Sequence, residues 1–331
     1  MLTETELLRE AATSGFRADV LEKAIRLMEL LEALRSHPYL KTRVALKGGT
    51  ALNLFVFDVP RLSVDVDLNY VGAAEVDAMV QERPKVEQAI QAVCGRLGIG
   101  VRRIPSGHAG GKWRLSYTGV RGPGTLELDV NFLLRTPLWP TALEDSRSLG
   151  KYAATHVPVL DLHELAAGKL AALFGRQASR DVFDARELLR REGLDRRRLR
   201  LGFVVYGGCN RQDWRTLSVD MAGTSPKEVD RQLVPMLRGG LAPGRTELEA
   251  WTLRLVDECR NLLGAVLPLE DDEIAFLTRL NNGGEIVPQL LTEDSTEQRI
   301  IAAHPGLLWK ALNVRKHLGL PTDGQGHQTS R

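Results

Sequence analysis

Two short segments that alternate strictly between apolar and polar residues constrain the fold of this chain more than any other feature. Residues 62–69 read Leu-Ser-Val-Asp-Val-Asp-Leu-Asn, and residues 125–134 read Thr-Leu-Glu-Leu-Asp-Val-Asn-Phe-Leu-Leu. A period of two predicts strands with one buried face and one polar face. The chain is therefore expected to build a sheet that carries a row of acidic side chains along one face.

Asp65 and Asp67 share the polar face of the first strand, about 6.5–7 Å apart along it. Carboxylates this close repel each other unless a cation lies between them, and Mg²⁺ is commonly held by one or two carboxylates together with substrate phosphates. If the second strand lies beside the first, Asp129 joins the pair. Three carboxylates can then hold one or two Mg²⁺ ions, with Mn²⁺ as an alternative. Glu127, on the same face, is the other candidate for the third ligand.

A Gly-Gly-Thr turn stands shortly before the first of these acids. Gly48, Gly49 and Thr50 follow one apolar run, 44–46, and precede another, 51–57. Strand, tight turn and helix is the expected order. Two glycines let the backbone approach a phosphate closely, and a helix N-terminus offers free N–H donors. We expect the Thr50 hydroxyl to cap this helix and the turn to bind a nucleotide phosphate.

Apolar periodicity predicts most of the other elements. Helices are expected at 17–35 and at 75–98, the latter interrupted near Pro84, and strands at 99–104 and 112–118 with a flexible turn, Ser106 to Gly111, between them. From about residue 160 onward, helical patterns dominate. The expected fold class is α+β, with a mixed sheet flanked by helices in residues 1–150 and a mainly α-helical domain in residues 151–331.

Cysteine use and hydropathy bear on the compartment. Cys94, Cys209 and Cys259 form no CxxC pair, so neither a disulfide framework nor a zinc site is expected. No stretch approaches the roughly 18 apolar residues of a membrane span. Charged residues also occupy the N-terminal segment, where a signal peptide needs an apolar core. We therefore expect a cytoplasmic protein without a membrane partner.

The motifs together resemble a known superfamily. Gly48-Gly49-Thr50-Ala51-Leu52, followed by Arg61-x-Ser63-x-Asp65-x-Asp67-Leu68, is similar to the nucleotidyltransferases typified by DNA polymerase β, and most similar to the AbiEii/AbiGii branch that includes the MenT toxins. A Lys-x-x-Ala segment at Lys169 and an Arg-Asp-x-x-Asp segment at Arg180 resemble the third and fourth motifs of that branch. The four motifs occur in the expected order over roughly residues 40–190. The resemblance implies a nucleotidyltransferase fold.

In this context the lysine and the two later aspartates gain expected roles. Lys169 interrupts an apolar stripe of the helix expected at 162–175, and we expect it to enter the active cleft and grip a triphosphate rather than reach solvent. Asp181 and Asp184, three residues apart, would share a helix face. The resemblance implies that one of them is functional, as a base or by orienting the nucleotide, and does not decide which.

Arginines near these motifs are candidates for contacts with phosphate. Arg61, with Ser63, directly precedes the acids, and a guanidinium suits groups that carry several oxygens. Arg176 and Arg180, four residues apart, are candidates for a clamp on phosphate or RNA, with plain solvation as the alternative. The arginines within 196–200 and the C-terminal helices are candidates for contacts with the acceptor, and a solvated helix or loop face is the alternative for these arginines.

The resemblance implies a toxin of a type IV toxin–antitoxin system, with an AbiEi-like antitoxin as a partner. It implies transfer of a nucleoside monophosphate from an NTP to RNA, with CMP or UMP added at the acceptor end of tRNA. Two alternatives stay open. One is transfer onto a protein hydroxyl, and the other is a non-catalytic module that binds RNA or protein on a degenerate nucleotidyltransferase fold.

Overall fold

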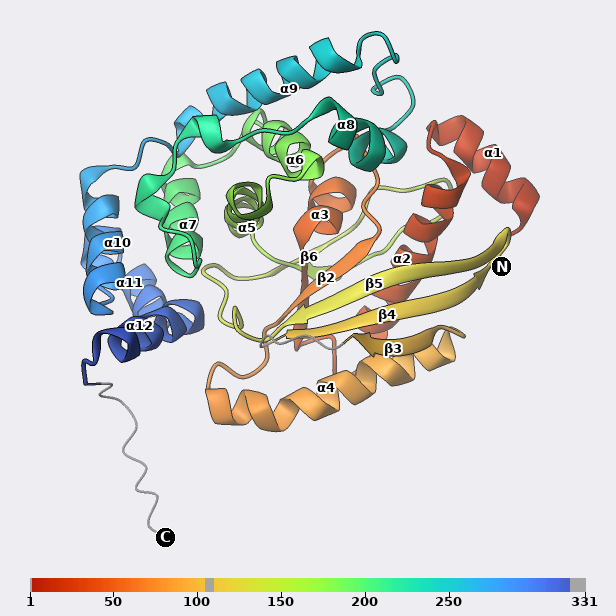
Figure 1. Ribbon diagram of the computed structural model, residues 1–331. Coiled ribbons are helices and arrows are strands. Elements are labelled where there is room, and N and C mark those ends of the chain that lie inside the picture. The colour runs from red at the N-terminus through yellow and green to blue at the C-terminus, as the bar shows by residue number, and fades with distance from the viewer. Residues whose placement is uncertain (1, 105–109, 322–331) are drawn as a thin grey trace.

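The computed structural model describes residues 2–104 and 110–321, so the turn expected between the strands at 99–104 and 112–118 lies mostly outside the described residues. The described strands are β1 (Val44–Lys47), β2 (Asp65–Tyr70), β3 (Gly100–Ile104), β4 (Gly110–Gly119), β5 (Gly122–Asn131), β6 (Ala142–Glu144) and β7 (Val157–Val159). They form one sheet in the order β3-β4-β5-β2-β1-β7-β6 (Figure 1).

The helices surround this sheet and continue beyond it to the C-terminal side. They are α1 (Glu4–Ser14), α2 (Ala18–Ser36), α3 (Gly48–Ala51), α4 (Val76–Arg96), α5 (Leu162–Arg176), α6 (Ser179–Leu189), α7 (Arg196–Gly208), α8 (Pro226–Glu228), α9 (Leu248–Leu262), α10 (Asp271–Gly283), α11 (Ser295–Ala302) and α12 (Pro305–Leu318). A π-helix, Leu52–Val56, continues α3. The expected α+β class with a mixed sheet is confirmed.

The centre of the sheet combines both strand directions. β2 runs parallel to β5 and antiparallel to β1, while β7 runs parallel to β1. Apolar residues of β2 and β5, such as Val66 and Leu128, are fully buried on one face. Helices α2 and α4 cover this face, as shown by Arg26 over the Tyr117 ring and Arg83 over the Phe132 ring. The opposite face, which carries the acidic side chains, is turned away from α2 and α4.

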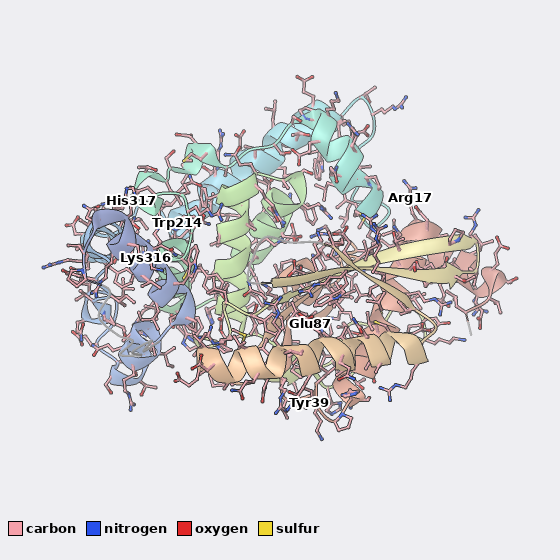
Figure 2. All side chains as sticks on the ribbon, turned by 60° about the horizontal axis from the view of Figure 1, so that its bottom comes forward. Arg17, Tyr39, Glu87, Trp214, Lys316 and His317 are labelled. Atoms are coloured by element: carbon pink, nitrogen blue, oxygen red, sulfur yellow. The ribbon has the colours of Figure 1, made fainter. Side chains whose placement is uncertain are left out.

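The expected interruption at Pro84 is wrong, because α4 is continuous from Val76 to Arg96 with Pro84 inside it. Proline removes one N–H donor and crowds the preceding turn. The following turns bury Val86, Ile90 and Val93 completely. This packing against the sheet offsets the lost hydrogen bond. Figure 2 shows α4 as one unbroken helix.

The C-terminal helices have their own aromatic centre and also reach back to the sheet. Trp214, labelled in Figure 2, is buried, with its ring centroid 5.9 Å from Phe174 and 5.3 Å from Phe203. The Leu62 N–H donates to the carbonyl of Met236 at 2.8 Å, just before β2 begins. β7 follows residue 150 and still belongs to the sheet. The domain boundary expected near residue 150 therefore stays a prediction. No described helix combines the length and apolarity needed to cross a membrane.

Candidate active site

The three expected carboxylates lie on one face of neighbouring strands. In the parallel pair β2–β5, Asp67 stands opposite Asp129 and Asp65 stands opposite Glu127. Residues opposite each other in a sheet share a face. Asp65, Asp67 and Asp129 accordingly line one cavity of about 280 Å³. The sheet register thus brings together the acids that the alternation placed on two separate strands.

Burial raises the pKa of each of these three carboxyl groups above its ordinary value. Repulsion from Asp67 adds to the effect at Asp65, and repulsion from Asp129 adds to it at Asp67. Lys47 opposes the shift at Asp67 and Asp129, because it stands opposite Asp67 on β1. Deprotonation of all three carboxyl groups at once is therefore unfavourable unless an additional cation binds in the cavity.

The donor set fits a hard divalent cation that is completed by substrate. Within residues 2–104 and 110–321, no three Asp, Glu, His or Cys side chains converge closely enough to enclose a metal by themselves. Mg²⁺ needs less, because one or two carboxylates and substrate phosphates commonly suffice. Glu127 is a weaker candidate for the third ligand, since its Oε2 forms an ion pair with Lys112 Nζ at 2.7 Å. Asp129 has no such partner among the described residues.

The two glycines of the turn make room for side chains of the site. Gly48 has a φ of +74°, and a Cβ atom there would lie 2.3 Å from Asp67 Oδ2. A Cβ on Gly49 would lie 2.9 Å from Ser63 Oγ. Gly49 and Ser63 line the cavity of the acids, and both glycines line a second cavity beside it. The Asp67 side chain therefore lies close to the backbone of the Gly48–Gly49 turn.

The expected capping role of Thr50 is wrong. Lys47 is the N-cap residue of α3, and it makes no side-chain capping bond. Thr50 lies inside the helix, is fully buried and donates its hydroxyl hydrogen to the backbone carbonyl of Asp65 at 2.6 Å. This bond joins the turn to the start of β2, and it leaves no Thr50 hydroxyl to contact a phosphate.

Lys169 lies in the cleft, as expected, but it already has two partners. Its Nζ is 3.0 Å from Asp181 Oδ1 and 2.8 Å from Asp184 Oδ2, and it lines both cavities. Arg176 also pairs with Asp181, Nε to Oδ2 at 2.5 Å. With Arg61, three cations meet two carboxylates in this cluster. The wall that faces the acids therefore carries surplus positive charge.

Arg61 and Asp184 are bound to each other, and Arg61 also lines the cavity of the acids. Arg61 is buried and binds Asp184 through two hydrogen bonds, and its third contact is to the carbonyl of Leu62. Asp184 is fully buried and lines neither cavity, and Arg61 and Lys169 hold its pKa well below the usual range against the opposing effect of burial. Both residues are therefore suited to holding the cleft together, and Asp184 is not placed to accept a proton. A contact between Arg61 and a phosphate stays a prediction.

The two arginines expected to form a clamp both line the cavity of the acids. Arg180 Nη1 lies 3.8 Å from Asp65 Oδ2, so it bridges from α6 to β2. The Arg176 side chain is 63% exposed even though it pairs with Asp181, so it remains accessible to a ligand. Among the arginines within 196–200, Arg200 is buried in an ion pair with Glu273 and does not form an acceptor surface.

Sequence reasoning missed Lys47, Lys112 and Glu164. Lys47 ends the apolar run and directly precedes Gly48. This position beside the turn was the only local sign that Lys47 belongs to the site. Lys112 stands opposite Asp129 on β4, a relationship that only the sheet register reveals. Glu164 is buried beside the second cavity, where burial raises its pKa to about 7.

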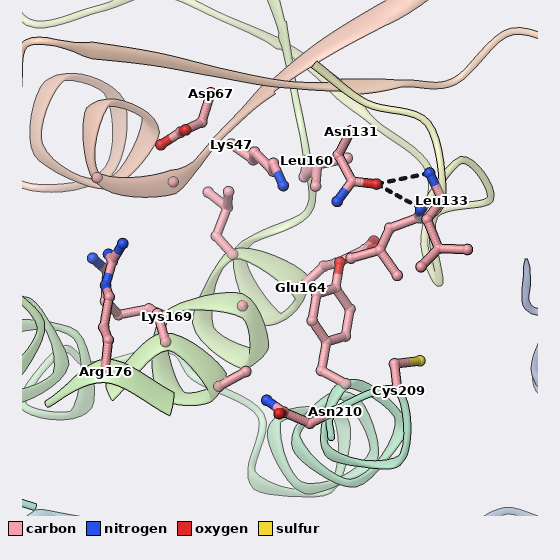
Figure 3. Close-up of a pocket in the computed structure, with 18 of the residues that line it drawn as sticks. Lys47, Asp67, Asn131, Leu133, Leu160, Glu164, Lys169, Arg176, Cys209 and Asn210 are labelled. Carbon is pink, nitrogen blue, oxygen red and sulfur yellow. Dashed lines mark hydrogen bonds between the residues drawn. The ribbon is translucent and has the colours of Figure 1, made fainter. Parts of the chain in front are cut away.

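The second cavity adjoins the first and is larger, at about 490 Å³. Both cavities are lined by Gly49, Asp67, Lys169 and Arg176. Figure 3 shows the second cavity with Lys47, Asp67 and Asn131 on the sheet side and Lys169 and Asn210 on the helical side. The cavity of the acids, which cationic side chains also line, thus adjoins a larger cavity lined by both polar and apolar residues.

The family described as nucleotidyl transferase AbiEii toxin, type IV toxin–antitoxin system, matches residues 29–272. The chain belongs to this AbiEii family. The resemblance predicted from the four motifs is thereby confirmed. The matched region contains the whole carboxylate cavity and extends well beyond the four motifs, into the C-terminal helices.

One solved structure agrees with this membership at the level of the fold. The nucleotidyltransferase toxin MenT4 of Mycobacterium tuberculosis aligns with a TM-score of 0.57 and 19% identity, over 93% of this AbiEii chain and 99% of MenT4. JHP933 of Helicobacter pylori aligns with a TM-score of 0.42 and 18% identity, over 75% of this chain and 93% of that one. A comparison with curated protein sequences gives no significant match.

Proposed function

We propose that the chain transfers a nucleoside monophosphate from an NTP to a hydroxyl of RNA, at the 3′ end of tRNA, and releases pyrophosphate. One arrangement carries the proposal: Asp65, Asp67 and Asp129 face Arg176 and Arg180 within a single cavity. A transferring phosphoryl group needs positioning and charge stabilisation more than covalent chemistry. This cavity provides both signs of charge a few ångströms apart.

Asp65, Asp67 and Asp129 would hold one or two Mg²⁺ ions, with Mn²⁺ as an alternative. When bound, such ions neutralise phosphate charge and favour the departure of pyrophosphate. The raised pKa values of the three carboxyl groups support this assignment, because a site that is costly to charge alone gains most from a cation.

The chain's own residues account for the other requirements of transfer. Arg176 is accessible at the junction of the two cavities and binds the triphosphate, while Gly48 and Gly49 bring the backbone close to it. Asp129 accepts the proton of the attacking hydroxyl. As the oxygen of that hydroxyl bonds to the α-phosphorus, the bond from the α-phosphorus to the pyrophosphate oxygen breaks. Lys169 holds Asp181 and Asp184 in place behind the phosphates.

An RNA acceptor is supported by a row of cations beside the acids. Lys112 stands opposite Asp129 on β4, and Arg114 stands opposite Arg102 on β3. These side chains share the face of the carboxylates, and both arginines are exposed. A strand of RNA that lies across β3 and β4 would meet these cations with its phosphates while its 3′ end reaches Asp129.

Family membership supports a protein partner as well. A toxin of a type IV system implies an antitoxin, and we propose an AbiEi-like protein in this role. The proposed place of action is the cytoplasm, where NTPs and tRNA are found.

The test is to incubate the protein with each α-labelled NTP, Mg²⁺ and total tRNA, and then to separate RNA from protein. Label in tRNA that disappears with Asp65→Ala and with Asp67→Ala supports the proposal. Label in protein alone would replace the RNA acceptor with a protein hydroxyl. Absence of any label, with RNA binding that Asp67→Ala leaves unchanged, would favour a non-catalytic binding module.

A further inference from the structure

The second cavity presents amide donors whose orientation is fixed by the backbone. Asn131 Oδ1 accepts hydrogen bonds from the N–H groups of Leu133 and Leu134, at 2.9 and 2.8 Å. Because both partners are donors, they must face the oxygen of the amide, and the NH₂ group is left for the cavity. Figure 3 shows the two bonds and the Asn131 nitrogen turned away from them.

Asn210 repeats this arrangement from the helical side. Its Oδ1 accepts from the Arg211 N–H at 2.8 Å and from the Gln212 N–H at 3.4 Å. In the described part of the chain, no residue accepts a hydrogen bond from Nδ2 of either asparagine. The lysine Lys47 adds a further donor to the same cavity. Both asparagines therefore present donors with a fixed direction to whatever enters.

Away from Asp67, where the two cavities meet, the carboxylate in the wall of this cavity is that of Glu164, and both of its oxygens are engaged. Glu164 Oε1 accepts from the Tyr206 hydroxyl at 2.9 Å, and Oε2 accepts from the Leu138 N–H at 3.0 Å. A ligand that covers the two asparagine amides must consequently supply acceptors, because their NH₂ groups would otherwise be buried without a partner. The volume of about 490 Å³ lies within the range of small-molecule sites.

We propose that this cavity receives the base of the NTP, and that Asn131 and Asn210 select a keto base, uracil or guanine, over an amino base, cytosine or adenine. The inference rests on the proposed function, because it places the triphosphate of the same nucleotide beside Asp67 and Lys169, where the two cavities meet. A ring carbonyl accepts from the amide NH₂. An exocyclic amino group at that ring position also donates, so two donors would face each other.

The test is equilibrium binding of UTP, CTP, GTP and ATP, each with Mg²⁺ and without RNA, measured by titration calorimetry. We expect the full-length protein to bind UTP over CTP and GTP over ATP by about tenfold. Asn210→Asp keeps one oxygen for the Arg211 N–H and turns the other, an acceptor, toward the base. The keto-to-amino affinity ratio should fall by about tenfold or more. The added negative charge weakens all four nucleotides and cancels in this ratio.

Asn131→Asp makes the same exchange on the sheet side, so the proposal stays testable if one variant does not fold. Asn261→Asp, an exposed exchange in α9, is the matched control and should leave the ratio unchanged. Nucleotide binding without a keto preference, or a preference that neither active-site variant alters, would overturn the base-selection inference and leave the transfer proposal intact. If none of the four nucleotides bound, the proposed function itself would be refuted.

Discussion

Arg61 and Asp184 form a buried ion pair with two hydrogen bonds, Nε to Oδ1 at 2.7 Å and Nη2 to Oδ2 at 2.5 Å. Their exposed fractions are 2% and 0%, and Lys169 is the second cation on the same carboxylate. Arg61 immediately precedes the acidic strand and Asp184 lies on α6. The pair therefore joins the sheet half of the cleft to its helical half.

Removing this carboxylate charge should be costly. Asp184→Asn leaves two buried cations short of a partner, and breaking a buried pair typically costs about 3–5 kcal/mol. We expect a loss of that size in the free energy of unfolding, measured by urea denaturation. Asp19→Asn, which removes the partner of Arg17 in an exposed pair, is the matched control and should change stability little. Equal effects of the two substitutions would contradict a structural role for the Arg61–Asp184 pair.

The three carboxyl groups of the cavity should reduce the stability of the metal-free protein at neutral pH. Their pKa values are raised, so between the ordinary carboxyl pKa and the raised one the folded state binds more protons than the unfolded chain. Stability therefore falls as pH rises through that window and stays lower above it. We expect Asp67→Asn to raise the Tm at pH 7 in chelator, and the gain to vanish below about pH 4.

Added Mg²⁺ should reverse the order of the Tm values of the wild-type protein and Asp67→Asn. A ligand that binds only the folded state raises the Tm, so the wild-type protein should gain more than Asp67→Asn. Asp58→Asn, at an exposed position, is the control and should behave like the wild type. Identical Mg²⁺ responses of wild type and Asp67→Asn would argue against a metal at this carboxylate.

Local patterns predicted the strands of the site well, because alternation is a property of a few consecutive residues. The placement of Asp65 and Asp67 on one face followed directly from it. That Asp129 would stand opposite Asp67 required β2 and β5 to pair in parallel, which no local pattern determines. The family resemblance supplied the expectation that these strands belong to one site.

Predictions failed where a distant contact outweighed a local preference. Thr50 has the position of a helix cap, but the carbonyl of Asp65 takes its hydroxyl instead. The buried ion pair of Arg61 was not predicted, because its partner Asp184 lies 123 residues away and leaves no trace in the local sequence. Lys47 was missed because a single lysine at a strand end has no motif, although the register places it opposite Asp67.

Gly48 offers a test of how closely the turn and Asp67 must approach. An added Cβ meets Asp67 Oδ2 at 2.3 Å, and the φ of +74° is strained for any other L residue. Gly98→Ala is a matched control, since Gly98 has a φ of +68° and no neighbouring atom within 4 Å. We expect Gly98→Ala to cost about 1–2 kcal/mol from backbone strain alone. Gly48→Ala should cost more, and it should also reduce the Mg²⁺-dependent rise in Tm, because the Asp67 carboxylate must move.

The cation row on β3 and β4 predicts a specific salt dependence of RNA binding. Each phosphate contact contributes roughly 0.7–0.9 to the slope of log affinity against log salt concentration. Arg102→Gln and Arg114→Gln should each lower that slope by about this amount while leaving NTP affinity unchanged, since neither residue lines the two cavities. Arg254→Gln, at an exposed position of α9, should leave the slope as it is. If the α9 variant lowered the slope and the strand variants did not, the acceptor would have to approach from the helical side, and the path across β3 and β4 would be wrong.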